Sequence, residues 1–249
     1  MNIQNSGFIK HKINHGSASM FNKADANLRL WALQYLFGFR DESGPAAARG
    51  LAVEGGMELI LRNKPGALDA AYAAFDASMQ GEISDKIEAE RAMIPGMIEQ
   101  IEQWKPPAPL LASQVKIEHW FDEVPIPIVG FIDFVFEDAS FIDLKTTKAC
   151  PSAGRPEHVR QIALYSEARK GAAGGLLYVT PKRLAHYPMA DEQRTQGIAE
   201  LRAIASFLDR FLLAFDSPED ALRATAPNTA DFRWNDAARS KLSEILGAA

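Results

Sequence analysis

Two short apolar segments, separated by a turn, carry their ionisable side chains on one side only. Residues 130–136 and 141–147 are rich in Phe, Ile and Val, which is typical of β-strands. Because side chains alternate along a strand, Asp133 lies on one face of the first segment, and Asp143 and Lys145 share one face of the second. Most of the other positions are apolar on both faces, which predicts two buried neighbouring strands. A buried carboxylate needs a charged partner, hydrogen bonds or a metal ion.

The sequence predicts helices in the N-terminal part of the chain, strands and helices in the middle, and helices again at the C-terminal end. The predicted helices cover residues 17–37, 46–61, 67–79, 82–104 with a break at Pro95-Gly96, 156–170, 191–215 and 235–246. The predicted strands cover residues 110–121, 126–136, 141–147, 176–180 and 185–189. We expect one α/β domain over residues 1–249, with a mixed β-sheet core. Its predicted parts are a mainly helical region at 1–104, an αβ core at 110–190 and C-terminal helices at 191–249.

The composition is that of a globular protein. Hydrophobic residues make up 47% and charged residues 24%, which excludes an intrinsically disordered chain or a coiled-coil fibre. Cys150 is the only cysteine, so a disulfide framework, a thiolate zinc site and a four-cysteine iron–sulfur cluster are excluded. No stretch approaches the ~18 apolar residues that a membrane helix needs, and the N-terminus lacks the pattern of a secretory signal. We therefore expect a cytoplasmic protein without a membrane partner.

Charge is unevenly distributed along the chain. Residues 145–183 contain eight basic and two acidic residues, a net charge of +6, whereas the whole chain has a formal net charge of −5. Such a segment favours contact with a phosphate backbone, and a solvated basic surface is the alternative interpretation.

Two aspartates and a lysine on neighbouring strands can do specific chemistry. Close carboxylates repel unless a cation lies between them, and hard oxygen donors suit Mg²⁺ or Mn²⁺. Lys145, two residues after Asp143 on the same face, can reach a water or phosphate beside such an ion. These groups are suited to metal-assisted phosphodiester hydrolysis. Asp133 and Asp143 share a face only if the connecting loop has an odd number of residues, a condition that a loop of residues 137–139 satisfies.

A structural interpretation competes with this one. An Asp-x-Lys pair can simply stabilise the end of a strand, and structural ion pairs also bury charges. The presence of Asp133 in a neighbouring buried strand brings the two interpretations to about equal weight.

Four motifs follow one another in a characteristic order. Gly130 to Asp133 is a G-x-x-D strand, Ile142 to Thr147 contains D-x-K-T, and Gln161 to Tyr165 is a Q-x-x-x-Y helix. Upstream of them, Arg49 to Glu54 lies in a predicted helix. Over roughly residues 14–190, the sequence resembles the PD-(D/E)XK nuclease superfamily, specifically its RecB-like and lambda-type exonuclease branch.

The resemblance implies a restriction-endonuclease-like core and a role for individual residues. The implied metal ligands are Glu54, Asp133, Asp143 and the backbone carbonyl of Leu144. The implied catalytic residues are Asp133, Asp143, Lys145, which would position or activate the attacking water, and Gln161 and Tyr165, which would line the active site. Expected DNA contacts, partly from the basic segment, are Thr146, Thr147, His158, Arg160, Lys182 and Arg183.

Some positions depart from the family pattern. Ile132 rather than Pro precedes Asp133, and Glu54 stands where many relatives have His, as in the lambda-type pattern. Glu58, one helical turn later, is a rival for the same role. Some relatives hold an iron–sulfur cluster on four cysteines, which Cys150 alone cannot supply.

The resemblance implies a Mg²⁺- or Mn²⁺-dependent deoxyribonuclease, an exonuclease of recombination, repair or phage DNA processing. DNA is the expected partner, and a recombination or single-strand-annealing protein and a second copy of the chain are further expected partners. Two alternatives stay open: a non-catalytic DNA-binding or scaffolding module with the nuclease fold, and a globular protein whose strand carboxylates serve structure only.

Overall fold

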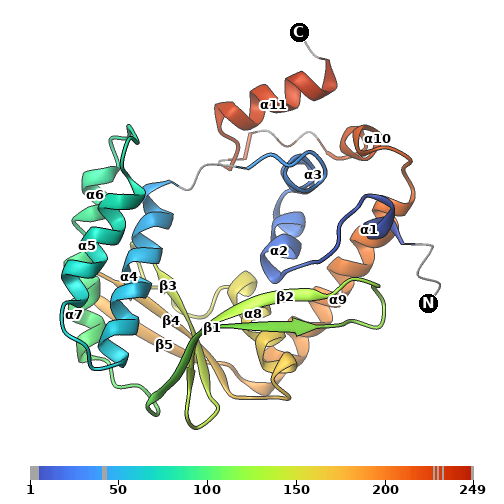
Figure 1. Ribbon diagram of the computed structural model, residues 1–249. Coiled ribbons are helices and arrows are strands. Elements are labelled where there is room, and N and C mark those ends of the chain that lie inside the picture. The colour runs from blue at the N-terminus through green and yellow to red at the C-terminus, as the bar shows by residue number, and fades with distance from the viewer. Residues whose placement is uncertain (1–5, 41–43, 227, 229, 232, 248–249) are drawn as a thin grey trace. The chain divides into compact units, whose positions relative to one another are not determined.

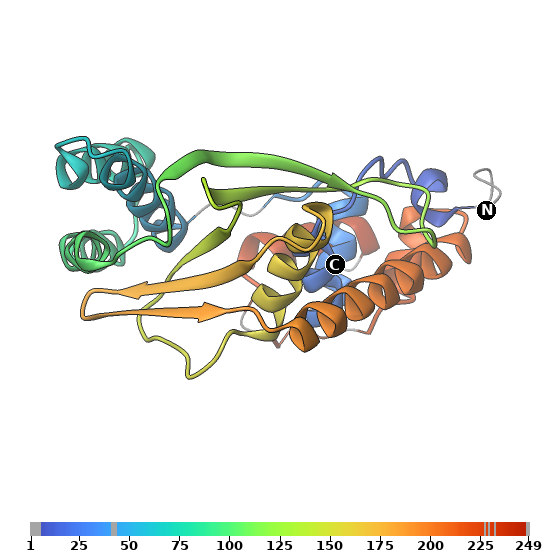
Figure 2. The ribbon, with the colours of Figure 1, turned by 90° about the horizontal axis from the view of Figure 1, so that it is seen from below.

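A five-stranded sheet with strand order β1-β2-β3-β4-β5 forms the centre of the fold. The strands are β1 (Leu110–His119), β2 (Ile128–Phe136), β3 (Phe141–Thr146), β4 (Gly174–Thr180) and β5 (Arg183–Pro188). β2 and β3 are antiparallel, β3 and β4 are parallel, and β4 and β5 are antiparallel, the last pair being clearest in Figure 2. The sheet is therefore mixed, as the sequence predicts. The predicted strands match the observed ones to within about two residues at most ends, which is the usual uncertainty of boundaries.

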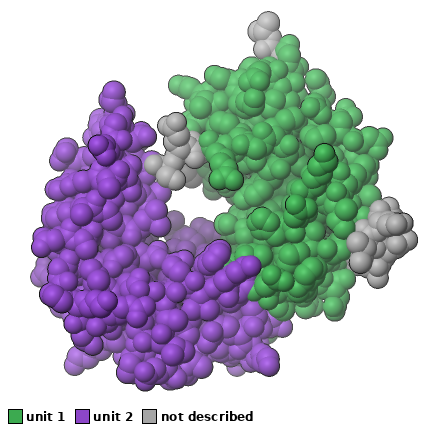
Figure 3. All heavy atoms as spheres, viewed as in Figure 1, with its two compact units in different colours: residues 1–42, 118–130, 195–249 green, residues 43–117, 131–194 purple. Residues whose placement is uncertain are grey.

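The computed structural model describes residues 6–40, 44–226, 228, 230–231 and 233–247. They divide into two compact units, each built from separate stretches of chain (Figure 3). Unit 1 comprises residues 1–42, 118–130 and 195–249, and unit 2 comprises residues 43–117 and 131–194. The expected helical region at 1–104 is thus shared between the units. A single domain over 1–249 stays a prediction.

Unit 2 packs helices on an apolar side of the sheet (Figure 1). Its helices are α4 (Pro45–Leu61), α5 (Ala67–Ser78), α6 (Ile87–Arg91), α7 (Ile94–Gln103) and α8 (Pro156–Ala168). The even-numbered side chains of the hairpin, such as Phe134, Ile142 and Leu144, are buried in one cluster with residues of α4, α5 and α7. Burial of this apolar area is the main stabilisation of the unit.

Helix α8 connects the parallel strands β3 and β4 and begins at Pro156, where proline is favoured. It meets the other, odd-numbered side of β3. The rings of Phe141 and Tyr165 lie 6.3 Å apart, and Lys145 contacts Gln161. The sheet therefore has one mainly apolar side, against α4, α5 and α7, and one side on which Lys145 lies beside α8.

Unit 1 is mainly helical. Its helices are α1 (Gly7–Lys10), α2 (Ala18–Ala26), α3 (Leu28–Leu36), α9 (Asp191–Leu213), whose first residues belong to unit 2, α10 (Pro218–Arg223) and α11 (Asp236–Leu246). Buried Asp209 accepts hydrogen bonds from the Ser6 hydroxyl and the Phe8 backbone N–H. A Cβ at Gly7 would lie 2.2 Å from the Asp209 carbonyl oxygen, so this approach of α1 to α9 requires glycine.

Three sequence predictions about local structure were wrong. The helix predicted at 17–37 is two helices, because the Asn27 side chain accepts a hydrogen bond from the Leu30 N–H and starts α3. The break in the helix predicted at 82–104 precedes Pro95, which lies in the first turn of α7. The strand 130–136 is not buried on both faces, since Phe131 is 50% exposed.

Candidate active site

The β2–β3 hairpin places Asp133 and Asp143 on the same face. Phe134 pairs with Ile142 and Val135 with Phe141, so the register sets residue 133 opposite residue 143. The Phe136 N–H donates to the Ser140 carbonyl at 2.9 Å, so Phe136 and Ser140 continue the same pairing and three residues, 137–139, lie between them. Ala139 has a φ of 68°, the left-handed conformation common at this position of three-residue hairpin loops. The odd loop length expected from the sequence is confirmed.

Two hydrogen bonds hold the Asp133 carboxylate. Oδ2 accepts from the Leu144 backbone N–H at 2.8 Å, and Oδ1 accepts from Nε2 of Gln114, on β1, at 3.2 Å. Burial raises the pKa of Asp133 well above its usual value, and the nearby carboxylates Asp143 and Glu54 raise it further. A carboxylate in this position is costly to ionise unless a positive charge comes close.

Asp143 and Lys145 form a close ion pair. Asp143 is 1% exposed, and Nζ of Lys145 lies 2.7 Å from its Oδ2. Burial alone would lower the pKa of Lys145, but Asp143 and Asp133 outweigh it and the pKa is raised. Lys145 is therefore charged at neutral pH.

A chain of hydrogen bonds continues from Lys145 into α8. Nζ of Lys145 donates to Oε1 of Gln161 at 3.1 Å, and Nε2 of Gln161 donates to the Tyr165 hydroxyl at 2.7 Å. Gln161 and Tyr165 are four residues apart and so share a helix face. Burial, more than the charge of Asp143, raises the pKa of the Tyr165 phenol, which keeps it neutral. The sequence-predicted set from β3 and α8 is thus brought together.

Glu54 and Glu58 lie on the same side of α4 but have different surroundings. Glu54 accepts a short hydrogen bond from the Gln114 amide, which also contacts Asp133. Burial raises the pKa of Glu54, and Asp143 adds to the effect against the opposing hydrogen bond from Gln114. Glu58 instead pairs with Arg62 at 2.8 Å, and this contact lowers its pKa. Of the two rivals, Glu54 is the one near the aspartates.

Thr146 and Thr147, at the end of β3 and expected to contact DNA, form hydrogen bonds with other groups of the protein. Thr146 accepts hydrogen bonds from Arg49 through its carbonyl and hydroxyl oxygens, at 3.2 and 3.3 Å. The Thr147 hydroxyl donates to the Ala149 carbonyl at 2.9 Å. Their contact with DNA stays a prediction.

The basic residues that were expected to contact DNA lie on α8 and at the β4–β5 turn. Nδ1 of His158 lies 2.7 Å from the Tyr178 hydroxyl, and burial, helped by the charge of Lys145, lowers the pKa of His158 to about 4. Arg160 is partly buried on α8. Lys182 and Arg183 are exposed, and their backbone N–H groups donate to the Thr180 hydroxyl. His158 is therefore neutral at pH 7, which differs from its expected contribution to a basic surface.

A family model matches almost the whole chain. The family model of the PD-(D/E)XK nuclease superfamily matches residues 15–248. The chain belongs to the PD-(D/E)XK nuclease superfamily. A search of curated proteins finds no significant match.

A solved structure has the same fold. One crystal structure, of a "Putative exonuclease" from Eubacterium rectale, aligns with a TM-score of 0.65 at 12% identity, covering 100% of this chain and 99% of that one. A second structure, of the protein SSO0001, aligns over 76% of this chain and 83% of its own at 16% identity, with a TM-score of only 0.33. The mixed sheet with flanking helices is the restriction-endonuclease-like α/β fold of the superfamily.

PD-(D/E)XK nucleases generally use divalent metals. As the side chains of the described residues stand, no three His, Cys, Asp or Glu groups form a ligand set, and Glu54 and Asp133 are bridged by Gln114 instead. The donor chemistry fits nonetheless, because carboxylates are the ligands that hard divalent cations prefer. Buried Oδ2 of Asp143 also has no hydrogen-bond partner of normal geometry, and only the charge of Lys145 offsets it.

Sequence reasoning missed two features of this nuclease. Gln114 was placed in a predicted strand without any role, because nothing in its local pattern marks it. Arg49 and Glu90 form a buried ion pair, and Lys148 approaches the other oxygen of Glu90 at 2.9 Å. Partners so distant along the chain leave no signal in a single sequence.

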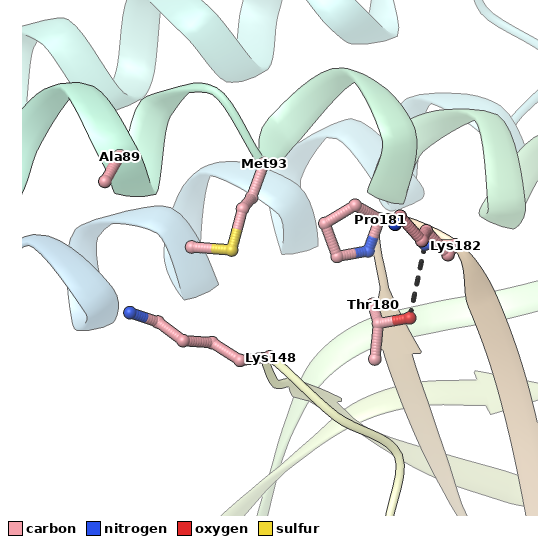
Figure 4. Close-up of a pocket in the computed structure, with 6 residues that line it drawn as sticks. All are labelled: Ala89, Met93, Lys148, Thr180, Pro181 and Lys182. Carbon is pink, nitrogen blue, oxygen red and sulfur yellow. Dashed lines mark hydrogen bonds between the residues drawn. The ribbon is translucent and has the colours of Figure 1, made fainter.

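A pocket of about 360 Å³ lies beside that ion pair in unit 2 (Figure 4). Its lining consists of Ala89, Met93, Lys148, Thr180, Pro181 and Lys182.

Within the described ranges, no helix is both long enough and apolar enough to cross a membrane.

Proposed function

We propose that this nuclease hydrolyses DNA phosphodiester bonds with the help of Mg²⁺ or Mn²⁺, and that it acts as an exonuclease. The observation that supports this most is the convergence of Glu54, Asp133 and Asp143 from three elements, with the Lys145 ammonium beside them. The name of the Eubacterium rectale protein supports an exonuclease rather than another nuclease. Recombination, repair or phage DNA processing, with a recombination or annealing protein as partner, is the proposed context.

Each residue has a proposed task. Glu54, Asp133, Asp143 and the Leu144 carbonyl would hold the ion. When bound, a divalent ion lowers the pKa of a water ligand and offsets charge that develops on the phosphate. Lys145 is charged, so its role is to donate a hydrogen bond to the attacking water or a phosphate oxygen rather than to remove a proton.

Gln161 and Tyr165 support Lys145 from α8. The Gln161 carbonyl oxygen orients the ammonium, and the neutral Tyr165 hydroxyl accepts from the Gln161 amide, which fixes the orientation of that amide. Both groups would line the path of the DNA strand. Thr146, Thr147, Arg160, Lys182 and Arg183 are proposed to contact its phosphates, with His158 as a neutral hydrogen-bonding group.

End-labelled linear DNA and covalently closed circular DNA test the proposal. Each is incubated with the protein in Mg²⁺, in Mn²⁺ or in a chelator. We expect loss of label from linear DNA only when a divalent ion is present, while circular DNA stays intact. Cleavage of circular DNA would show that the protein is an endonuclease rather than an exonuclease. DNA binding without any cleavage would favour the non-catalytic module instead.

A further inference from the structure

Gln114 has an unusual backbone conformation for its place in a strand. Its φ is +50°, in the left-handed region that non-glycine residues seldom adopt. The residue nonetheless lies inside β1 and is neither at a turn nor at a strand end. Such conformations persist where the surrounding structure holds them, and they cluster at functional sites.

This conformation lets two successive side chains reach the same helix. In a regular strand, Ser113 and Gln114 would point to opposite faces. Here the Ser113 hydroxyl accepts a hydrogen bond from Arg62, the C-cap residue of α4, at 3.4 Å, and the Gln114 amide donates to Glu54 within α4. The alternation of exposure along β1 also shifts by one residue between Ala112 and Ser113, directly before Gln114, as an extra residue in a bulge would cause.

The amide nitrogen of Gln114 contacts two carboxylates that come from different elements. Nε2 donates to Oε1 of Glu54, on α4, and lies 3.2 Å from Oδ1 of Asp133, on β2. An amide nitrogen has two N–H donors, enough for one bond to each oxygen. These two hydrogen bonds offset repulsion among the carboxylates. That repulsion is one reason why the pKa values of Glu54 and Asp133 are raised, since Asp143 raises both and Glu54 raises that of Asp133.

We propose that Gln114 is a positioning residue for the divalent cation, holding Glu54 and Asp133 where the ion binds. The inference rests on the proposed function of the same carboxylates. A carboxylate oxygen has a second lone pair, so it can accept a hydrogen bond from Gln114 and bind a cation at the same time. Hydrogen-bond partners of metal ligands commonly change metal affinity by about 10–100-fold when removed.

Calorimetric titration with Mn²⁺ tests the proposal on two variants. Gln114→Met keeps the length of the side chain without the donor, and Gln114→Gly removes the side chain while suiting the left-handed backbone. We expect both to bind Mn²⁺ about tenfold more weakly than wild type. Ser113→Ala is the matched control, because it removes the neighbouring contact with α4 without changing any charge. Its Mn²⁺ affinity should equal that of wild type.

Two further measurements separate positioning from a structural role. The melting temperature of Gln114→Gly should stay close to that of wild type, since relief of the left-handed backbone opposes the loss of the side chain. In cleavage assays, the metal concentration for half-maximal rate should rise about tenfold, whereas kcat at saturating metal should change by less than about threefold.

Unchanged Mn²⁺ affinity in both Gln114 variants would overturn the proposal. Tighter binding would also overturn it, because it would show that the amide competes with the cation. If wild-type protein itself neither binds Mn²⁺ nor cleaves DNA, the proposed function fails. If wild type does both and the variants match it, the role of Gln114 alone fails.

Discussion

Unit 2 contains two clusters of charged side chains, each around a buried carboxylate, that differ in their balance of charge. Around Asp143, the described residues bring together three carboxylates, with Glu54 and Asp133, and one ammonium, Lys145. Around Glu90, one carboxylate faces two cations, Arg49 and Lys148. The first cluster has an excess of negative charge, and the second does not.

The pKa values reflect this difference. In the first cluster, burial and mutual repulsion raise the pKa values of Asp133 and Glu54, so their ionised forms are unfavourable without a further cation. In the second, burial lowers the pKa of Arg49, while the Glu90 carboxylate opposes that effect. A buried ion pair alone therefore does not indicate a site. The excess of carboxylate around Asp143 makes the first cluster the candidate site, because a bound cation would stabilise it.

The largest expected effect is on cleavage. Asp143→Asn and Lys145→Ala should each lower kcat by at least about 10³-fold, because each removes a charge beside the reacting phosphate. Lys148→Ala, which removes the equivalent lysine of the second cluster, should change kcat by less than about threefold. Rates on end-labelled DNA measure this, with circular dichroism as the test of folding. Full activity in either site variant would contradict the assignment.

The second expected effect is on stability and belongs to the other cluster. Arg49→Met should lower the free energy of unfolding by about 3–5 kcal/mol, since it leaves buried Glu90 poorly compensated. The double variant Arg49→Met/Glu90→Leu should regain most of that loss, because no buried charge remains. Urea unfolding measures both. For comparison, Arg62→Ala, at an exposed pair, should cost about 0.5 kcal/mol.

A smaller effect separates the two lysines that line the pocket. Among the described residues, Lys182 has no carboxylate partner within ion-pair distance, whereas Lys148 pairs with Glu90. Lys182→Ala should weaken DNA binding uniformly across sequences and reduce the salt slope by about 1. Lys148→Ala should change the slope less. Fluorescence anisotropy at several salt concentrations checks this, and equal slopes would show that the ion pair with Glu90 does not restrain Lys148.

The smallest expected effect is a pH dependence. The pKa of His158 is about 4 in the folded protein, below its ordinary 6.5, so the unfolded chain binds the proton more readily. The stability associated with neutral His158 is complete above pH 6.5 and is lost as the pH falls through 4. His158→Asn should therefore lose less stability than wild type over this window. Parallel curves from urea unfolding at successive pH values would contradict the prediction.

Local patterns predicted the hairpin and its aspartates well. Alternation along β2 and β3 and a three-residue loop decide which side chains share a face, and both depend only on neighbours in sequence. The pairing of Gln161 with Tyr165 likewise follows from helical spacing. The error at Phe131 arose because composition shows that a residue is apolar but does not show whether anything covers it.

Residues joined by packing could not be predicted in the same way. Whether Glu54 or Glu58 approaches the aspartates depends on how α4 packs against β1, since Glu54 contacts Gln114 whereas Glu58 pairs with Arg62. The left-handed backbone at Gln114 could not be predicted either, because the residue type does not indicate that conformation.

The order of elements, the shared face of the two aspartates and the nuclease motifs were determined by the sequence alone. Only the tertiary structure decided which acid of α4 lies near the two aspartates and which amide bridges Glu54 and Asp133. It also decided which buried carboxylate, Glu90, is fully paired with cations of the chain. The reason is physical. Periodicity acts over a few residues, whereas charge and hydrogen bonding act between side chains whose proximity exists only after the helices have packed on the sheet.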